Sequence, residues 1–124
     1  MQQVVPMIHV PNVRNTVDWY KGIGFTVRST NEPDGEMDWA SLLFGNSEIM
    51  LTEGGHVSTE NRREVDLYIR TDDVEGLYRQ LKGRIEIRLG LNDTFYGTRE
   101  FIVRDLNGFW VTFGQELDTI TPPR

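Results

Sequence analysis

The chain has 124 residues, of which 38% are hydrophobic and 26% are charged, and it contains no cysteine. This length and composition predict one folded globular domain rather than a disordered segment. The absence of cysteine excludes a disulfide framework, a thiolate nucleophile and a thiolate metal site. The formal net charge of −6 opposes binding to nucleic acid or to an anionic membrane.

Two features of the sequence bear on its location in the cell. The first six residues lack the basic and apolar regions of a signal peptide. No apolar run approaches the roughly 18 residues that a membrane-spanning helix needs. We therefore expect a cytoplasmic protein, with neither nucleic acid nor membrane as a partner.

The first half of the chain predicts a strand, a helix and three strands. In chain order these are a strand at 4–10, a helix that Asn12 caps and Gly22 ends, a strand at 25–29, a loop at 31–35, and strands at 38–44 and 47–53. Gly45-Asn46 separates the last two strands and is typical of a hairpin turn.

The same order of elements returns in the second half, after a polar linker at 54–63. It comprises a strand at 65–70, a helix capped by Asp72 or Asp73 and ended by Gly83, a strand at 84–89, a loop at 90–98, strands at 99–104 and 109–115, and a frayed tail. We therefore predict a single α+β domain over 1–124, built from two tandem βαβββ modules at 3–53 and 64–115, with the tail at 116–124.

In each module the single helix can cover only one face of its sheet. The uncovered face must meet the other module, a second chain or a ligand, so we expect function there. The two-residue period of strands assigns residues such as Val4, Ile8, Val65 and Phe113 to the core. It assigns the following candidate ligand-binding residues to the open face: Met7, His9, Trp39, Glu48, Met50, Asp66, Tyr68, Trp110 and Thr112. Ser41 and Arg70 are placed beside them.

Two stretches resemble the vicinal oxygen chelate superfamily, which contains glyoxalase I, extradiol dioxygenases, fosfomycin-resistance enzymes and bleomycin-resistance proteins. Val10–Tyr20, followed by Gly22–Phe25, resembles its opening helix. Tyr96–Phe101, followed by Arg104–Gly108, resembles its closing hairpin and is most similar to bleomycin-resistance proteins. The likeness runs from about Val4 to Gln115.

The resemblance implies sheets that curl around a cleft, with the helices outside, and a homodimer. It also implies a divalent metal, bound by His and Glu on the first and last strand of each half. Those positions fall here on Val5, Met50, Asp66 and Thr112, of which only Asp66 is a good ligand. Because divalent-metal sites normally need three or more good ligands, we predict no metal, no other cofactor and no catalytic residue.

The favoured interpretation is metal-free binding and sequestration of a small molecule, such as the cationic aromatic antibiotic bleomycin. Trp39 and Trp110 would stack on a flat ring system, while Glu48 and Asp66 would attract cationic groups. Alternatively, the two tryptophans fill the core or a dimer interface.

Two other functions remain open at this point. One is a metal-dependent lyase, isomerase or dioxygenase with an atypical site, for which His9, Glu48 and Asp66 are the candidate ligands. The other is a regulatory or accessory domain that uses its open face only for association.

Overall fold

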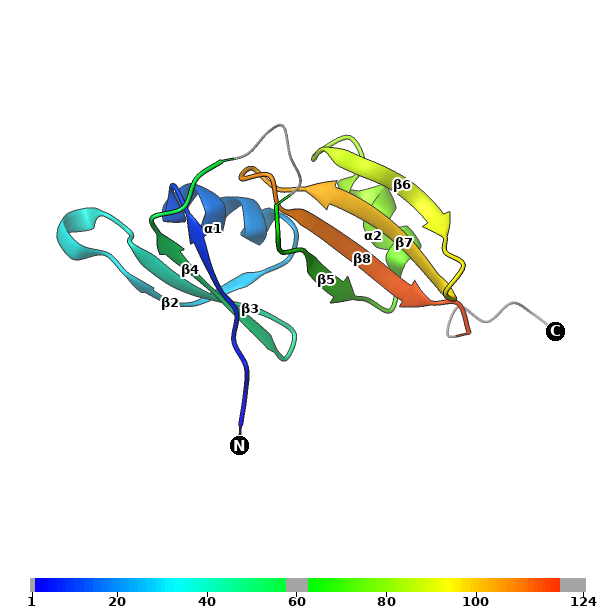
Figure 1. Cartoon of the computed structure of the whole chain (residues 1–124), viewed down its shortest axis with the longest axis horizontal. Helices are drawn as coiled ribbons and strands as arrows, with labels where there is room; N and C mark the ends of the chain where they lie inside the picture. Colours follow the sequence, from blue (N-terminus) through cyan, green and yellow to red (C-terminus); the bar gives the residue numbers. More distant parts are fainter. Residues whose placement is uncertain (1, 58–62, 119–124) are drawn as a thin grey trace. The chain divides into compact units, whose positions relative to one another are not determined.

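A computed structural model describes residues 2–57 and 63–118. The chain divides into two compact units, Met1–Ser58 and Thr59–Arg124. Each unit contains a strand, a helix and three further strands, so the predicted α+β fold of two tandem βαβββ modules is confirmed (Figure 1). Residues 58–62 of the predicted linker and residues 119–124 of the predicted tail lie outside the described residues.

The elements of the two units follow each other in the same order. The first unit contains β1 (Met7–Val10), α1 (Val13–Gly22), β2 (Thr26–Asn31), a short 3-10 helix (Pro33–Gly35), β3 (Trp39–Phe44) and β4 (Ser47–Glu53). The second unit contains β5 (Leu67–Arg70), α2 (Val74–Leu81), β6 (Ile87–Asp93), β7 (Thr98–Arg104) and β8 (Trp110–Glu116). In the described part of the chain, no helix has the length and apolar character needed to cross a membrane.

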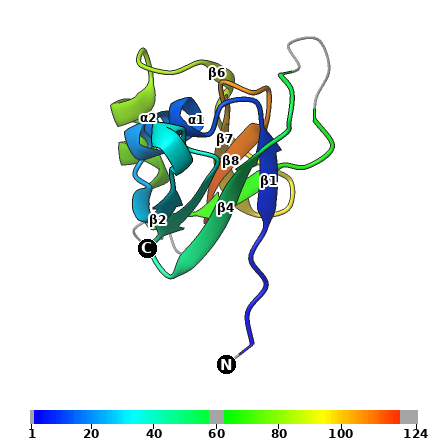
Figure 2. The same ribbon diagram turned by 90° about the vertical axis from the view of Figure 1, so that its left-hand side faces the viewer.

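Each unit forms one four-stranded mixed sheet. The strand orders are β1-β4-β3-β2 and β5-β8-β7-β6. In both sheets the first pair is parallel and the other two pairs are antiparallel. Figure 2 shows the parallel pair of the first unit, with β1 beside β4. The connection through each helix produces this parallel pair, because parallel neighbours need a crossover.

Both helices begin at a side-chain cap. Asn12 accepts a hydrogen bond from the backbone N–H of Asn15 at 2.9 Å, and Asp73 accepts one from Gly76 at 3.1 Å. The alternative between Asp72 and Asp73 therefore resolves to Asp73. The helix α1 contacts β2, β3 and β4, whereas α2 contacts β7 and β8, so each helix covers one face of its own sheet.

The covered faces carry the apolar cores. Fully buried residues of the first unit include Val10, Ala40, Leu42 and Leu51, and those of the second include Phe101, Val103, Val111 and Phe113. The rings of Phe101 and Phe113 stack at a centroid distance of 4.9 Å. The period-two alternation of the sequence thus identified the core-facing residues of β4 and β8 correctly.

The first strand of each unit was predicted to start too early, at 4 instead of Met7 and at 65 instead of Leu67. Val4 is 93% exposed and Val65 is 52% exposed, so neither belongs to the core. Pro6 accepts a hydrogen bond from the N–H of Met50 at 2.8 Å but has no N–H to donate, so the ladder does not continue back to Val4. In the second unit Leu67 pairs with Val111, one residue into β8, which leaves Val65 without a strand to pair with.

The loop predicted at 90–98 was also partly wrong. Strand β6 starts later than expected and runs through Gly90 to Asp93. Its pairing with β7 shifts register between Ile87 and Leu89 and again between Leu89 and Asn92. These irregularities allow a strand to continue past a glycine that sequence reasoning takes for a loop.

Candidate functional site

The open face of the first sheet is defined by its register. Met7, Met50 and Ser41 pair in one row, and His9, Thr52 and Trp39 pair in the next. Their neighbours along the strands, such as Ile8, Leu51 and Ala40, are buried in the core beneath α1. Met7 and His9 are exposed, whereas Trp39 and Met50 are half-buried.

The carboxylate of Glu48 has partners within its own unit. Ser41 donates a hydrogen bond to it, and the guanidinium of Arg28 lies 3.6 Å away. Ser41 is fully buried, and the side chain of Glu48 is only 10% exposed. Arg28 therefore offsets part of the negative charge that Glu48 brings to the open face.

The four positions at which the resemblance places metal ligands contain one carboxylate. Val5 precedes β1 and Met50 lies on β4, in the first unit. In the second unit Asp66 is exposed just before β5, and Thr112 on β8 is buried. Because valine offers no donor atom, and thioether and hydroxyl groups are poor ligands for hard divalent ions, these residues do not fit such a metal.

The displaced set of His9, Glu48 and Asp66 does not fit a metal either. His9 is level with Thr52, which is four residues along β4 from Glu48, or about 13 Å of strand. Within the described ranges, no three His, Asp or Glu side chains are grouped so that they could hold an ion.

The open face of the second sheet carries larger exposed groups. Tyr68, Thr112 and Ile102 pair in one row, and Arg70, Gly114 and Glu100 in the next. Tyr68 is 46% exposed. Trp110 is half-buried on the same face, and the guanidinium of Arg88 lies 5.3 Å from the centroid of its ring.

A buried carboxylate that sequence reasoning missed lies at the centre of this face. Glu100 is 4% exposed and accepts hydrogen bonds from Tyr68 Oη at 2.5 Å, Tyr96 Oη at 2.8 Å and Thr98 Oγ1 at 2.9 Å. A sequence signal was available, since Tyr96, Thr98 and Glu100 alternate and therefore share one face of a strand. We call these four residues the Glu100 cluster.

The cluster changes the acidity of its phenols. Partial burial and the hydrogen bond to Glu100 raise the pKa of Tyr68 to about 12. The hydrogen bond to Glu100, together with burial, also raises the pKa of Tyr96. Both phenols therefore stay protonated at neutral pH and act as hydrogen-bond donors to the carboxylate.

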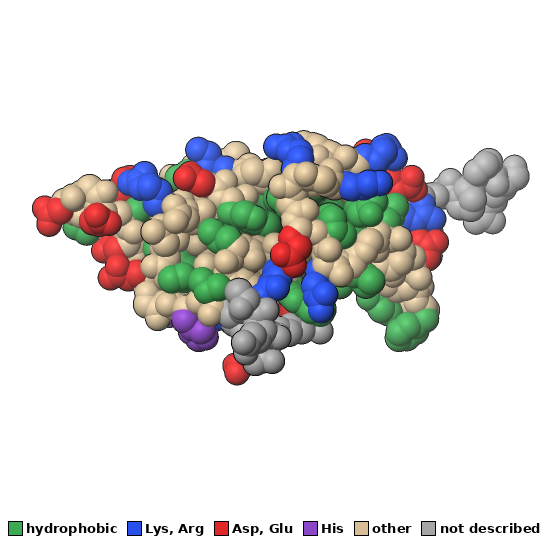
Figure 3. Space-filling model, turned by 90° about the horizontal axis from the view of Figure 1, so that it is seen from above, with side chains coloured by type: hydrophobic (Ala, Val, Ile, Leu, Met, Phe, Trp, Pro, Cys, Tyr) green, Lys and Arg blue, Asp and Glu red, His purple; other side chains and the backbone are tan. Residues whose placement is uncertain are grey.

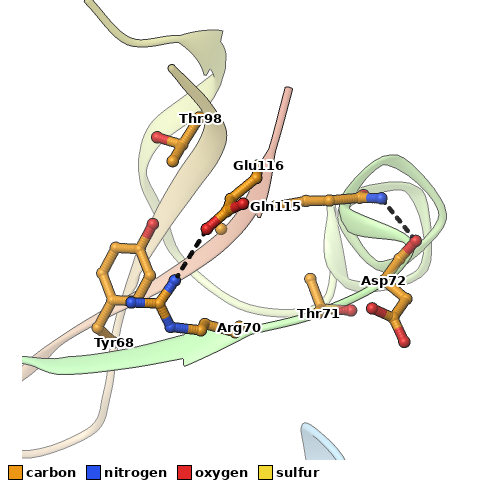
Figure 4. A pocket seen from close by; sticks show the side chains of 8 residues that line it. Tyr68, Arg70, Thr71, Asp72, Thr98, Gln115 and Glu116 are labelled. Carbon is orange, nitrogen blue, oxygen red and sulfur yellow. Dashed lines mark hydrogen bonds and ion pairs between the residues drawn. The ribbon is translucent and has the colours of Figure 1, made fainter. Parts of the chain in front are cut away.

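Next to the Glu100 cluster is a pocket of about 140 Å³ (Figure 4). It is lined by Tyr68, Arg70, Thr71, Asp72, Thr98, Gly114, Gln115 and Glu116. Gly114 makes room for the Tyr68 ring at this pocket, because a Cβ atom there would lie 2.1 Å from Tyr68 Oη. A shallower hollow of about 480 Å³ shares Thr98 and Glu116 with this pocket and extends to Tyr96 and Asp118.

Apolar side chains also reach the surface between the charged ones (Figure 3). In the second unit Phe95 is 99% exposed and Tyr96 is 58% exposed, and their rings meet edge to face at 5.1 Å. Both belong to the turn between β6 and β7, and Tyr96 lines the larger hollow. Exposed aromatic rings at the border of a hollow are typical of binding sites.

A family model matches almost the whole chain. It is described as the Glyoxalase/Bleomycin resistance protein/Dioxygenase superfamily and matches residues 2–113. Among curated proteins none matches the sequence.

Solved structures share the fold at low sequence identity. TioX from Micromonospora sp. ML1 is 22% identical with a TM-score of 0.77, over 94% of this chain and 100% of that one. A bleomycin-binding protein complexed with bleomycin is 17% identical with a TM-score of 0.72, over 94% and 99% of the two chains. A bleomycin resistance determinant encoded on transposon Tn5 is 17% identical with a TM-score of 0.69, over 94% and 98%.

Proposed function

We propose, since the chain belongs to the Glyoxalase/Bleomycin resistance protein/Dioxygenase superfamily, that it binds and sequesters a small cationic aromatic molecule without a metal ion. Bleomycin is the first ligand to test, because one of the similar structures is a bleomycin-binding protein complexed with that drug. Sequestration needs only affinity and no reacting group. The proposal includes a homodimer that works in the cytoplasm.

The single observation that carries this proposal is the mismatch between the family's metal positions and the residues at them. Val5, Met50 and Thr112 leave Asp66 as the only good ligand among the four. The same open faces carry exposed or half-buried side chains that suit a flat ligand, notably Trp39, Tyr68 and Trp110. Open faces that carry aromatic side chains but one good metal ligand favour small-molecule binding over metal chemistry.

The proposed binding residues are those of the two open faces. They are Met7, His9, Trp39, Glu48, Met50, Asp66, Tyr68, Trp110 and Thr112. Their roles differ: the rings supply stacking area, the methionines supply adaptable apolar contact, and Asp66 supplies negative charge. Glu48 contributes less charge than its sequence predicts, because Arg28 pairs with it.

Tryptophan emission tests the proposal directly. Bleomycin titrated into the protein in the presence of EDTA should quench emission saturably, because stacking on an indole ring alters its emission. The variant Trp110→Phe should lose much of the quenching. Trp19→Phe is the matched control, since Trp19 lies on α1 against Tyr20, away from the open face.

Two results would overturn the proposal. The first is no quenching and no heat of binding at high micromolar bleomycin, which rejects this ligand. The second is binding or turnover that appears only after nickel, zinc, manganese or iron is added, which would support the metalloenzyme alternative instead.

A further inference from the structure

Among the described residues, Glu100 receives side-chain hydrogen bonds from hydroxyl groups and has no cationic partner. All three groups that contact its carboxylate are neutral: Tyr68, Tyr96 and Thr98. In the described part of the chain, no arginine or lysine lies within ion-pair distance of it. A carboxylate removed from water and left without a cation is costly, so an arriving cation would be favoured beside it.

Two of these hydroxyl groups connect Glu100 to the neighbouring pocket. Tyr68 and Thr98 donate their protons to Glu100 and also line the pocket. A hydroxyl that donates in one direction keeps lone pairs with which to accept in another, and Thr98 Oγ1, which also accepts from Thr94 Oγ1 at 2.8 Å, keeps one. Hydrogen bonding to a carboxylate also polarises the oxygen and strengthens it as an acceptor. The pocket therefore presents oxygen acceptors backed by a buried negative charge.

The charged residues at the pocket also favour a cation over an anion. Asp72 and Glu116 line it and Glu100 lies behind it, whereas Arg70 is the one cation among these lining residues. The resulting sum of three carboxylates and one guanidinium is −2. Other things being equal, a cation would enter and an anion would be repelled.

Arg70 shows how a cation is held at this place. Its guanidinium lies 3.7 Å from the carboxylate of Glu116 and 5.7 Å from the centroid of the Tyr68 ring (Figure 4). The side chain of Arg70 is 78% exposed, so this pairing is weak and easily displaced. Arg70 thus makes, from the solvent side, contacts that a ligand cation would make from within the pocket.

We propose that the pocket between Tyr68, Thr98, Gly114 and Glu116 is a subsite for a protonated primary amine. An ammonium group has three donors and no acceptor, which matches the oxygens of Tyr68, Thr98 and Glu116. The pocket volume of about 140 Å³ is below the roughly 300–1,000 Å³ of pockets for drug-sized ligands, so it takes one aminoalkyl arm. The inference rests on the proposed function and adds that the sequestered molecule carries such an arm.

A simple amine tests the subsite without the unknown ligand. We would titrate the full-length protein with n-butylamine, which is protonated at neutral pH, and follow backbone amide shifts by NMR. The amides of Thr98, Gly114 and Glu116 should shift together, with a Kd on the order of 1–10 mM for so small a probe. Neutral n-butanol should leave them unchanged.

Two substitutions should move the affinity in opposite directions. Tyr68→Phe removes one acceptor oxygen and should weaken n-butylamine binding on the order of tenfold. Arg70→Gln removes the competing cation and should tighten it about two- to fivefold. Tyr78→Phe is the matched control, because it deletes a phenol on α2, on the covered side of the same sheet, and should change nothing.

The subsite and the proposed function can fail separately. No amide shift with n-butylamine up to about 100 mM, or equal shifts with n-butanol, would overturn the subsite while bleomycin quenching still stood. Weaker binding in Arg70→Gln would also overturn it, since Arg70 would then be part of an anion site. If Tyr68→Phe does not fold, Thr98→Val removes the other hydroxyl acceptor of the subsite and should also weaken binding.

Discussion

The two sheets of this chain have the same topology but carry different side chains on their open faces. Register makes the pair Met7 and Met50 on the first sheet equivalent to Tyr68 and Thr112 on the second. In the adjoining row, His9, Thr52 and Trp39 of the first sheet correspond to Arg70, Gly114 and Glu100 of the second. The same topology therefore places a tryptophan in one unit where it places a buried carboxylate in the other.

The difference is clearest in how each face treats its buried acid. Glu48 has the guanidinium of Arg28 at 3.6 Å, so the first sheet neutralises its own charge. Among the described residues the side-chain partners of Glu100 are all hydroxyl groups, and Gly114 in the next strand leaves room for the Tyr68 ring that donates to it. The two units thus share an apolar covered face, which packing constrains, while their open faces carry different chemistry.

If the covered faces are equivalent, truncating either core should be severely destabilising. Phe113→Ala removes a fully buried ring stacked on Phe101 and should cost about 3–5 kcal/mol of unfolding free energy. The equivalent change in the first unit, Leu51→Ala, should cost about 2–5 kcal/mol. Urea unfolding followed by circular dichroism measures both. A cost below about 1 kcal/mol in either unit would show that its core is not packed as described.

The next largest loss of stability should come from adding a side chain at Gly114, on the open face of the second sheet. Gly114→Ala places a Cβ atom 2.1 Å from Tyr68 Oη and should push that ring away from Glu100. Since this leaves a buried carboxylate short of one donor, we expect a loss of about 1–3 kcal/mol in thermal unfolding experiments.

The equivalent position on the first sheet supplies the control for this change. Thr52→Ala should cost less than about 1 kcal/mol, because the one hydrogen bond of Thr52 Oγ1, to the carbonyl of Asp38, is long at 3.4 Å. Equal losses at positions 52 and 114 would remove the distinction between the two faces.

The division between faces was predictable from sequence because strand alternation is local. Trp39 and Ser41 were predicted on the open face, and the pairing of β3 with β4 puts them opposite Thr52 and Met50. Strand starts were not predictable, since they depend on a partner elsewhere in the chain. Val65 illustrates this: its β-branched side chain favours a strand, but the strand that Leu67 joins offers no partner that far back.

The Glu100 cluster escaped sequence reasoning for a related reason. A single Glu in an alternating strand is usually a solvated residue, and the resemblance at Tyr96–Phe101 gives it no role. Its partner Tyr68 comes from 32 residues earlier and reaches it only because β8 lies between β5 and β7. The alternation of Thr98 and Glu100 is visible in the sequence, but the non-local contact with Tyr68 leaves no periodic signal.

A smaller loss of stability is expected in both units when the N-terminal cap of the helix is removed. Asn12→Ala and Asp73→Ala each remove a capping oxygen and should each cost about 1 kcal/mol. Asp72→Ala is the matched control and should stay within about 0.5 kcal/mol, because Asp73 is the cap. Chemical denaturation of the three variants compares them. A larger cost for Asp72→Ala than for Asp73→Ala would reverse the assignment of the cap.

The smallest expected effect is in the titration of Tyr68, on the second sheet, at high pH. Burial and the bond to Glu100 raise the pKa of Tyr68 to about 12 in the folded protein, whereas an unfolded tyrosine has a pKa of about 10. The folded state therefore holds this proton more tightly. Its contribution to stability is complete below pH 10 and is lost as the pH rises from about 10 to 12.

Phenolate absorbance near 295 nm, recorded for the native protein and for Tyr68→Phe, isolates this group by difference. The difference curve should have its midpoint near pH 12, and Glu100→Gln should lower that midpoint because the negative charge behind the phenol is gone. A midpoint near pH 10 in the native protein would mean that Tyr68 does not donate to Glu100. The hydrogen-bonded, buried Glu100 would then no longer distinguish the open face of the second sheet from that of the first.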